Sequence, residues 1–171
     1  MNTRSRFLLL NIVGGVAVLG SYVWGIGLFP ELRDAFWGGV PESLRGIYTI
    51  NMFFAAAGYI GAFTFFMLKV SDNNYQRLAL PYILILLPSA LWLPLTVAVL
   101  QHPSEWLWWL IRIDLFAVGL GGLLLYPAIW QTPASSAFKA AVMFGLLFFC
   151  LQTAVLDALI WPYYFELPAA R

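Results

Sequence analysis

Long apolar runs separated by short polar stretches make up most of the chain. A helix needs about 20 mainly apolar residues to cross the hydrocarbon layer of a bilayer. Runs of that length predict five spans, at residues 7–29, 47–68, 78–100, 106–130 and 137–161. The pattern therefore predicts an all-α integral membrane protein, a five-transmembrane-helix bundle, in which residues 1–171 form a single transmembrane domain.

Composition agrees with this prediction and excludes several classes of function. Hydrophobic residues make up 62% of the chain and charged residues 10%, whereas soluble domains carry about 25% charged residues. A formal net charge of +1, with no block of lysine or arginine, argues against a nucleic-acid partner. One cysteine and one histidine exclude an internal disulfide, a bis-histidine haem site and a zinc site. We therefore expect no bound metal.

Basic residues beside the spans predict the orientation of the chain. If the N-terminus is cytoplasmic, one set of basic residues lies inside, namely Arg4, Arg6, Lys69, Arg77 and Lys139. Arg33, Arg45 and Arg171 then lie outside among acidic residues. Cytoplasmic segments are usually the richer in lysine and arginine. We therefore predict a multi-pass protein with its N-terminus in the cytoplasm and its C-terminus outside.

The first connection, residues 30–46, is longer than the later ones and contains aromatic residues. Gly38, Gly39 and Pro41 are expected to break any helix there. A long connection is more often a lid or a docking surface than a plain link. Two interpretations stay open at this point: a lid over a ligand site, and an interfacial connector anchored by Trp37.

The third span contains Pro81, Pro88 and Pro94. A proline beyond the first turn removes one hydrogen bond of the helix and kinks it, which leaves space beside it. Trp92 lies between two of these prolines at mid-depth, away from the interfacial positions that membrane tryptophans usually take. Its indole N–H therefore needs a hydrogen-bond partner in the protein or in a ligand.

Charged residues inside the last two spans predict a polar centre. A charge at membrane depth costs about 3 kcal/mol or more, so it is normally enclosed by protein or water. Arg112 and Asp114 are two residues apart and point to different sides of a helix, so they cannot neutralise each other. At 1.5 Å per residue, Arg112 lies about 9 Å and Asp157 about 6 Å below the outer boundary. We therefore predict an ion pair between these two residues, with Asp114 facing Asn51 or water.

The purpose of this ion pair is open at the level of sequence. One interpretation is a structural pair that fixes helix packing, and the other is a site in which Arg112 binds a ligand carboxylate or phosphate. Small residues spaced three or four apart predict where helices pack closely. They include Gly14, Ala17, Ser21 and Gly25 in the first span, Asn51, Ala55, Gly58 and Ala62 in the second, and Asp114, Ala117 and Gly121 in the fourth.

Two segments are similar to a known family. SALWLPLT at residues 89–96 and WLIRIDLFAVGLGGLLL at residues 109–125, together with five spans, a long first loop and eight tryptophans, resemble the translocator protein or tryptophan-rich sensory protein family. The resemblance implies a homodimeric α-helical bundle whose pocket, under the first loop, binds porphyrins or sterol-like lipids. Its site residues carry over to Trp92, Pro94 and Asp114.

Together these patterns predict a membrane-embedded binding protein, sensor or transporter. The expected ligand is hydrophobic and planar, a porphyrin or a sterol-like lipid, in a pocket of the outer half under the first loop. No cofactor is expected beyond porphyrin or haem bound as that ligand. The candidate ligand-binding residues are Trp24, Trp37, Asn51, Trp92, Pro94, Arg112, Asp114 and Asp157.

The alternative prediction is a small accessory or structural subunit of a larger membrane protein complex. Membrane lipid is an expected partner in both cases, as is either a second copy of the chain or a larger complex. An enzyme is not expected, because Ser89, Cys150 and His102 have no convergent catalytic partners in the sequence.

Overall fold

A computed structural model of the chain describes residues 2–70 and 75–167. Asp72 and Arg171 therefore lie outside the described residues. Helices and loops account for all of the described part. In chain order the elements are α1 (Thr3–Leu28), η1 (Pro30–Leu32), η2 (Ala35–Trp37), α2 (Glu42–Lys69), α3 (Gln76–Gln101), α4 (Glu105–Gln131), α5 (Ser136–Cys150), η4 (Leu151–Ile160) and α6 (Trp161–Tyr164).

Five helices of the described chain are long and apolar enough to cross a membrane. They are α1, α2, α3, α4 and the continuous helix that α5, η4 and α6 form from Ser136 to Tyr164. The all-α architecture and the five candidate spans predicted from the sequence are confirmed at this level. The boundaries differ most at three places, because α1 already begins at Thr3, residues 42–46 belong to α2, and the fifth helix continues past Trp161 to Tyr164.

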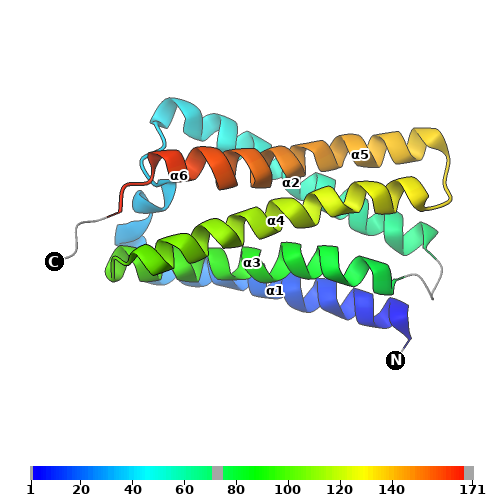
Figure 1. Cartoon of the computed structure of the whole chain (residues 1–171), viewed down its shortest axis with the longest axis horizontal. Coiled ribbons are helices and arrows are strands. Elements are labelled where there is room, and N and C mark those ends of the chain that lie inside the picture. Colours follow the sequence, from blue (N-terminus) through cyan, green and yellow to red (C-terminus); the bar gives the residue numbers. More distant parts are fainter. Residues whose placement is uncertain (1, 71–74, 168–171) are drawn as a thin grey trace.

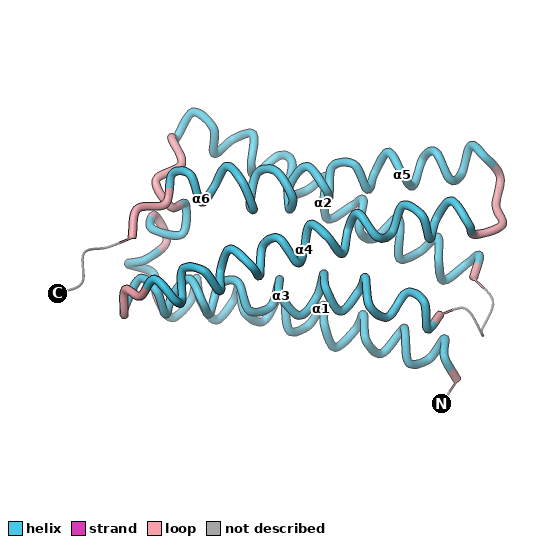
Figure 2. The backbone as a smooth tube through the Cα atoms, in the orientation of Figure 1, coloured by secondary structure: helices cyan, strands magenta, loops and turns pink. Residues whose placement is uncertain are grey.

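The five long helices lie side by side along the long axis of the molecule (Figures 1 and 2). α1 packs on α3, α3 on α4, α4 on α5 and η4, and α5 on α2. α1 therefore packs chiefly against α3, not against α2, which follows it in the chain. The first loop and the end of α6 lie at one end of the bundle, called here the loop end, and the start of α1 lies at the other (Figure 1).

Glycines allow the helix backbones to approach closely at the predicted contact stripes. A Cβ atom at Gly58 of α2 would collide with the backbone of Gly145 in α5. A Cβ atom at Gly121 of α4 would lie 2.8 Å from the carbonyl oxygen of Pro81 in α3. Gly14 of α1 is similarly enclosed by α3. The small residues therefore mark interfaces in which helices pack without large side chains between them.

The first loop packs onto the loop end of the bundle. The Trp161 indole Nε1–H donates a 2.9 Å hydrogen bond to the carbonyl oxygen of Phe36, whose side chain packs with Leu93 of α3. Gly38 and Gly39 have φ angles of 62° and 86°, which side-chain-bearing residues rarely adopt. As predicted, these glycines interrupt the helix, and α2 begins after Pro41, a residue that favours a helix start.

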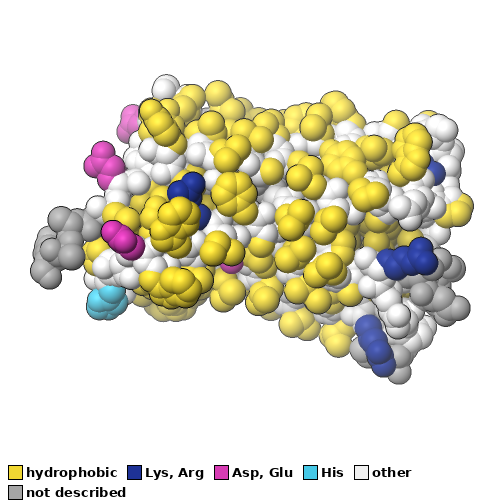
Figure 3. All heavy atoms as spheres, in the orientation of Figure 1, with side chains coloured by type: hydrophobic (Ala, Val, Ile, Leu, Met, Phe, Trp, Pro, Cys, Tyr) yellow, Lys and Arg dark blue, Asp and Glu magenta, His cyan; other side chains and the backbone are white. Residues whose placement is uncertain are grey.

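Apolar side chains cover much of the outer surface. Figure 3 shows them along the length of the visible face. On α1, Val16, Leu19 and Val23 are 67%, 70% and 75% exposed. Soluble monomers rarely expose continuous apolar surface of this extent. The surface is therefore the kind that faces lipid or another membrane helix.

Candidate functional site

The fifth helix changes its geometry at Leu151, where α5 gives way to the π-helix η4. In a π-helix the backbone hydrogen bonds join residues five apart, so each turn is wider than in an α-helix. Gln152 and Asp157 are five apart, and the Gln152 Nε2–H donates a 2.8 Å hydrogen bond to Asp157 Oδ1. In an α-helix these two residues would point about 140° apart. The π-helix therefore brings this pair together.

Asn51 of α2 extends this pair into a chain of hydrogen bonds. Its Nδ2–H donates to Gln152 Oε1 at 3.0 Å and to the Phe148 carbonyl oxygen at 3.1 Å. Asn51 and Gln152 are both buried. We call Asn51, Gln152 and Asp157 the polar chain. It links α2 to the fifth helix in the interior, and it gives Asn51 a different partner from the predicted Asp114.

The predicted ion pair between Arg112 and Asp157 is wrong. Within the described residues, the ion pair found is Arg45 with Asp34 at 3.5 Å, and Asp157 is bonded to Gln152 instead. The Arg112 guanidinium carbon lies 4.9 Å from the centroid of the Trp109 ring, a cation–π contact. Arg112 Nε is buried and has no hydrogen-bond partner in the described part of the chain.

The register between α4 and the fifth helix explains the error. Gly119 packs against Ala154, and Gly122 packs against Cys150. In antiparallel helices this register places Arg112 closer to the level of Trp161 than to that of Asp157, which lies further from the loop end.

Aromatic side chains converge around Trp92 near the loop end. The Trp92 ring lies 5.8 Å from Tyr22 of α1 and 6.1 Å from Trp161 of α6, measured between ring centroids. Trp161 in turn lies 5.8 Å from Trp108 and 4.8 Å from Phe165. We call these five residues the aromatic cluster. It joins α1, α3, α4 and the end of the fifth helix.

The two indoles at the centre of the cluster differ in their hydrogen bonding. Trp161 Nε1–H is bonded to the Phe36 carbonyl, whereas Trp92 Nε1–H is buried and has no partner among the described residues. Pro94 lies two residues further along α3, and its ring nitrogen cannot donate to the Ala90 carbonyl. No described protein atom therefore supplies the hydrogen-bond partner that the Trp92 N–H was predicted to need.

Asp114 is a second polar residue whose bonding is incomplete. It is 8% exposed, and its Oδ2 has no hydrogen-bond partner within the described chain. Gly121, two turns further along α4, packs against Pro81 and Ile85. In antiparallel helices that register places Asp114 at the level of residues 88–92 of α3. We infer that an unpaired donor, on Trp92, and an unpaired acceptor, on Asp114, occupy about the same level of neighbouring helices.

The remaining predicted residues lie apart from Trp92. Trp24 contacts Phe29, with ring centroids 5.2 Å apart, and is 38% exposed. Trp37 lies 6.2 Å from Tyr48, and Arg45 lies over its ring. Of the eight predicted residues, the structure thus assigns Trp92 to the aromatic cluster, Asn51 and Asp157 to the polar chain and Trp37 to the first loop. The other four, Trp24, Pro94, Arg112 and Asp114, lie outside these three groups.

Several residues of these groups were not predicted from the sequence. Tyr48 Oη–H donates a 2.9 Å hydrogen bond to the Leu156 carbonyl and so ties α2 to η4. Tyr22 of α1 lies 5.8 Å from the Trp92 ring, measured between ring centroids, and joins α1 to the aromatic cluster. Gln152, Trp161 and Phe165 were also missed. The abundance of aromatic residues near the C-terminus was the available signal for the last two.

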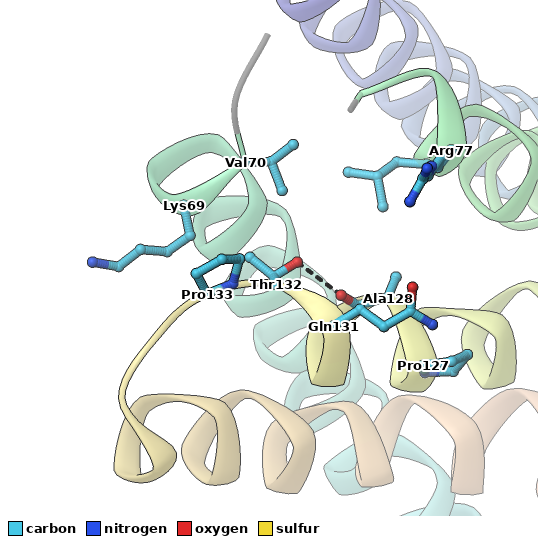
Figure 4. Close-up of a pocket in the computed structure, with 9 residues that line it drawn as sticks. Lys69, Val70, Arg77, Pro127, Ala128, Gln131, Thr132 and Pro133 are labelled. Carbon is cyan, nitrogen blue, oxygen red and sulfur yellow. Dashed lines mark hydrogen bonds between the residues drawn. The ribbon is translucent and has the colours of Figure 1, made fainter. Parts of the chain in front are cut away.

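A cavity of about 340 Å³ lies at the end of the bundle opposite the predicted pocket (Figure 4). Its lining comes from the end of α2, the start of α3 and the end of α4 with the loop that follows. In the described residues, no group of three histidine, cysteine, aspartate or glutamate side chains is placed to hold a metal ion.

Comparisons with known proteins identify no relative of this chain. No family model matches the chain, no curated protein matches it, and no solved structure matches its fold. The resemblance to the translocator protein family stays a prediction, and function has to be argued from the geometry above.

Proposed function

We propose that this chain is an integral membrane protein that binds a hydrophobic planar ligand, of the porphyrin or sterol-like class, at the aromatic cluster. The observation that carries the proposal is the Trp92 indole N–H, which is buried among aromatic rings without a hydrogen-bond partner in the described chain. A buried donor left unpaired costs about 1–3 kcal/mol. A ligand that supplies an acceptor there removes that cost.

The chemistry around Trp92 suits a flat, mostly apolar molecule. Tyr22, Trp92 and Trp161 offer ring faces and edges, which favour stacked or edge-to-face contact with another flat ring system. A carbonyl, carboxylate or hydroxyl oxygen on such a ligand can accept the Trp92 N–H. We place the ligand's polar group there and not at Arg112, whose guanidinium lies over the 53% exposed Trp109.

The first loop is suited to act as a lid over this cluster. Phe36 accepts the Trp161 N–H through its carbonyl and packs on α3 through its side chain. Because the rings already contact one another, a ligand can enter only if some of them, or the loop, move aside. Loops of this kind act mainly on ligand escape and on closure.

The test is a titration of the detergent-purified protein with protoporphyrin IX, followed by porphyrin absorbance and by tryptophan fluorescence. Trp92→Phe keeps the apolar ring and removes the N–H. Losing a hydrogen bond of about 1–1.5 kcal/mol should weaken binding about five- to tenfold. Trp106→Phe, at a 68% exposed position of α4 near the same end, is the matched control and should leave the affinity unchanged. Equal affinities for all three proteins would refute the proposed site.

A second candidate function is that of an accessory subunit of a larger membrane complex. It is favoured by α1, which packs chiefly on α3 and whose glycines at positions 15, 20 and 27 face open space. Small residues on an open helix face allow another membrane helix to approach closely. If the purified protein binds neither a porphyrin nor a sterol, this function replaces the first.

A further inference from the structure

The end of the bundle opposite the loop end collects basic side chains, and we call it the basic end. It carries Arg4 and Arg6 at the start of α1, Lys69 at the end of α2, Arg77 at the start of α3 and Lys139 at the start of α5. The aspartates and glutamates that the structure describes belong to the loop end or to helix interiors, while Asp72 lies outside the described residues. The described part of this end is therefore strongly cationic.

The cavity of about 340 Å³ opens among these residues. Its lining includes the polar residues Lys69, Arg77, Gln131 and Thr132, and its apolar lining includes Val70, Leu78 and Pro127. Figure 4 shows the Arg77 and Gln131 side chains on the same side of the space, from α3 and α4, whereas Lys69 extends away from it. A cation and an amide thus face the cavity, and most of the remaining lining residues are apolar, while the Thr132 hydroxyl donates to the Ala128 carbonyl.

Arg77 has no side-chain partner among the described residues, unlike Lys139, Arg4 and Lys69. Lys139 Nζ donates a 2.7 Å hydrogen bond to the Trp130 carbonyl, and Arg4 donates one to the Met67 carbonyl at 3.3 Å. Lys69 Nζ lies 5.8 Å from the centroid of the Phe138 ring. Within the described residues, Arg77 makes no hydrogen bond, ion pair or ring contact. No described residue therefore occupies its guanidinium.

The position of the cavity along the helices indicates where an anion bound there would come from. Lys69 is the last residue of α2, Gln76 the first of α3 and Gln131 the last of α4. Ends of membrane-spanning helices lie at the level of the lipid headgroups. Basic pockets between helices on the cytoplasmic side bind anionic headgroups, and the positive-inside pattern assigns this end to the cytoplasm.

We propose that the cavity binds the headgroup of an anionic phospholipid, with the phosphate at Arg77 and Gln131. The planar guanidinium can bind two phosphate oxygens at once, and the Gln131 amide can donate to the same group. A volume of about 340 Å³ is at the small end of ligand pockets, which span about 300–1,000 Å³. It suits a headgroup with its glycerol, while the acyl chains stay in the bilayer. The site does not depend on the ligand proposed for the aromatic cluster.

The experiment is native mass spectrometry of the full-length protein in a neutral detergent, titrated with palmitoyl-oleoyl phosphatidylglycerol or phosphatidylcholine. Wild type should bind the anionic lipid more tightly. Arg77→Gln should lower its affinity for phosphatidylglycerol about fivefold, which corresponds to roughly 1 kcal/mol per basic side chain near an anionic surface. Arg6→Gln removes an equal charge from the same end outside the cavity lining, and it should change the affinity less than twofold.

Two further measurements distinguish lipid binding in the cavity from attraction by general surface charge and from binding of free phosphate. Ala128→Leu fills part of the cavity without altering charge, and should also weaken phosphatidylglycerol binding. Inorganic phosphate at millimolar concentration should not displace the lipid, because the apolar walls of the cavity add to the affinity for a lipid but not to that for free phosphate. Equal losses for Arg77→Gln and Arg6→Gln, an unchanged affinity for Ala128→Leu, or displacement by inorganic phosphate would each overturn the proposal. Circular dichroism of each variant checks that the helices are intact.

Discussion

The polar chain gives a quantitative prediction, because its hydrogen bonds cross from α2 to the fifth helix. Asn51→Ala removes both donations from Asn51 Nδ2, to Gln152 Oε1 and to the Phe148 carbonyl. Hydrogen bonds between membrane helices contribute about 0.6 kcal/mol on average and at most about 1.7 kcal/mol. Two such bonds lead us to expect a loss of about 1–3 kcal/mol in the free energy of unfolding.

Gln152→Ala is expected to cost at least as much. It removes the acceptor used by Asn51 and also the donor to Asp157 Oδ1, which leaves a carboxylate oxygen without that bond in the protein interior. Unpaired charged groups are more costly than unpaired neutral ones. Because the two substitutions share one hydrogen bond, the double variant should cost less than the sum by about 0.6–1.7 kcal/mol.

The assay is reversible unfolding in mixed micelles, followed by circular dichroism, for wild type, both single variants and the double variant. Thr49→Ala is the control, since its hydroxyl bonds within α2, to the Arg45 carbonyl, and contributes nothing between helices. It should change the free energy of unfolding by less than about 0.5 kcal/mol. Strictly additive effects of Asn51→Ala and Gln152→Ala would show that the polar chain does not hold the two helices together.

Three further predictions test the packing, the corrected ion pair and the orientation. Gly58→Ala should destabilise the protein by at least about 1–3 kcal/mol, because its Cβ would meet the Gly145 backbone; Gly61→Ala, which meets open space, should be neutral or stabilising in the same unfolding assay. Arg112→Ala and Asp157→Ala should have additive effects on the free energy of unfolding, since Arg112 and Asp157 share no contact. A coupling energy above about 0.5 kcal/mol between the two substitutions would instead support the predicted ion pair. A cysteine at Ser43 should react with a membrane-impermeant maleimide in intact cells and one at Ser135 should not, with reversed labelling inverting the proposed orientation.

The architecture was predictable because it depends on run length and on small residues. An apolar run of about 20 residues leaves few alternatives to a spanning helix, and all five runs lie in long helices. Gly58 and Gly121 lie where backbones meet because a larger side chain would keep the helices apart. The predicted break at Gly38 and Gly39 likewise follows from their positive φ angles.

The partners of the polar residues were not predictable from spacing alone. The pattern gave no sign that the fifth helix becomes a π-helix at Leu151, and that change is what pairs Gln152 with Asp157. An α-helical wheel separates these residues, and a count of depth along the helices assigns Asp157 to Arg112 instead. The need of Trp92 for a partner was foreseen, since it depends only on an indole N–H at mid-depth. The positions of Tyr22 and Trp161 beside Trp92 depend on which helices pack together, and the sequence pattern does not show this.

The most direct test of ligand binding at the aromatic cluster is the indole N–H spectrum of the ¹⁵N-labelled protein in detergent micelles. The chain has eight tryptophans, and Trp92→Phe identifies the resonance of Trp92 by its loss. On addition of protoporphyrin IX, we expect the Trp92 resonance to move furthest, because its N–H, which has no partner in the described chain, gains an acceptor beside a flat ring system. The resonances of Trp106 and Trp130, 68% and 70% exposed, should stay near their positions. A spectrum that does not change, or one in which the Trp106 and Trp130 resonances move as far as that of Trp92, would contradict ligand binding at the aromatic cluster.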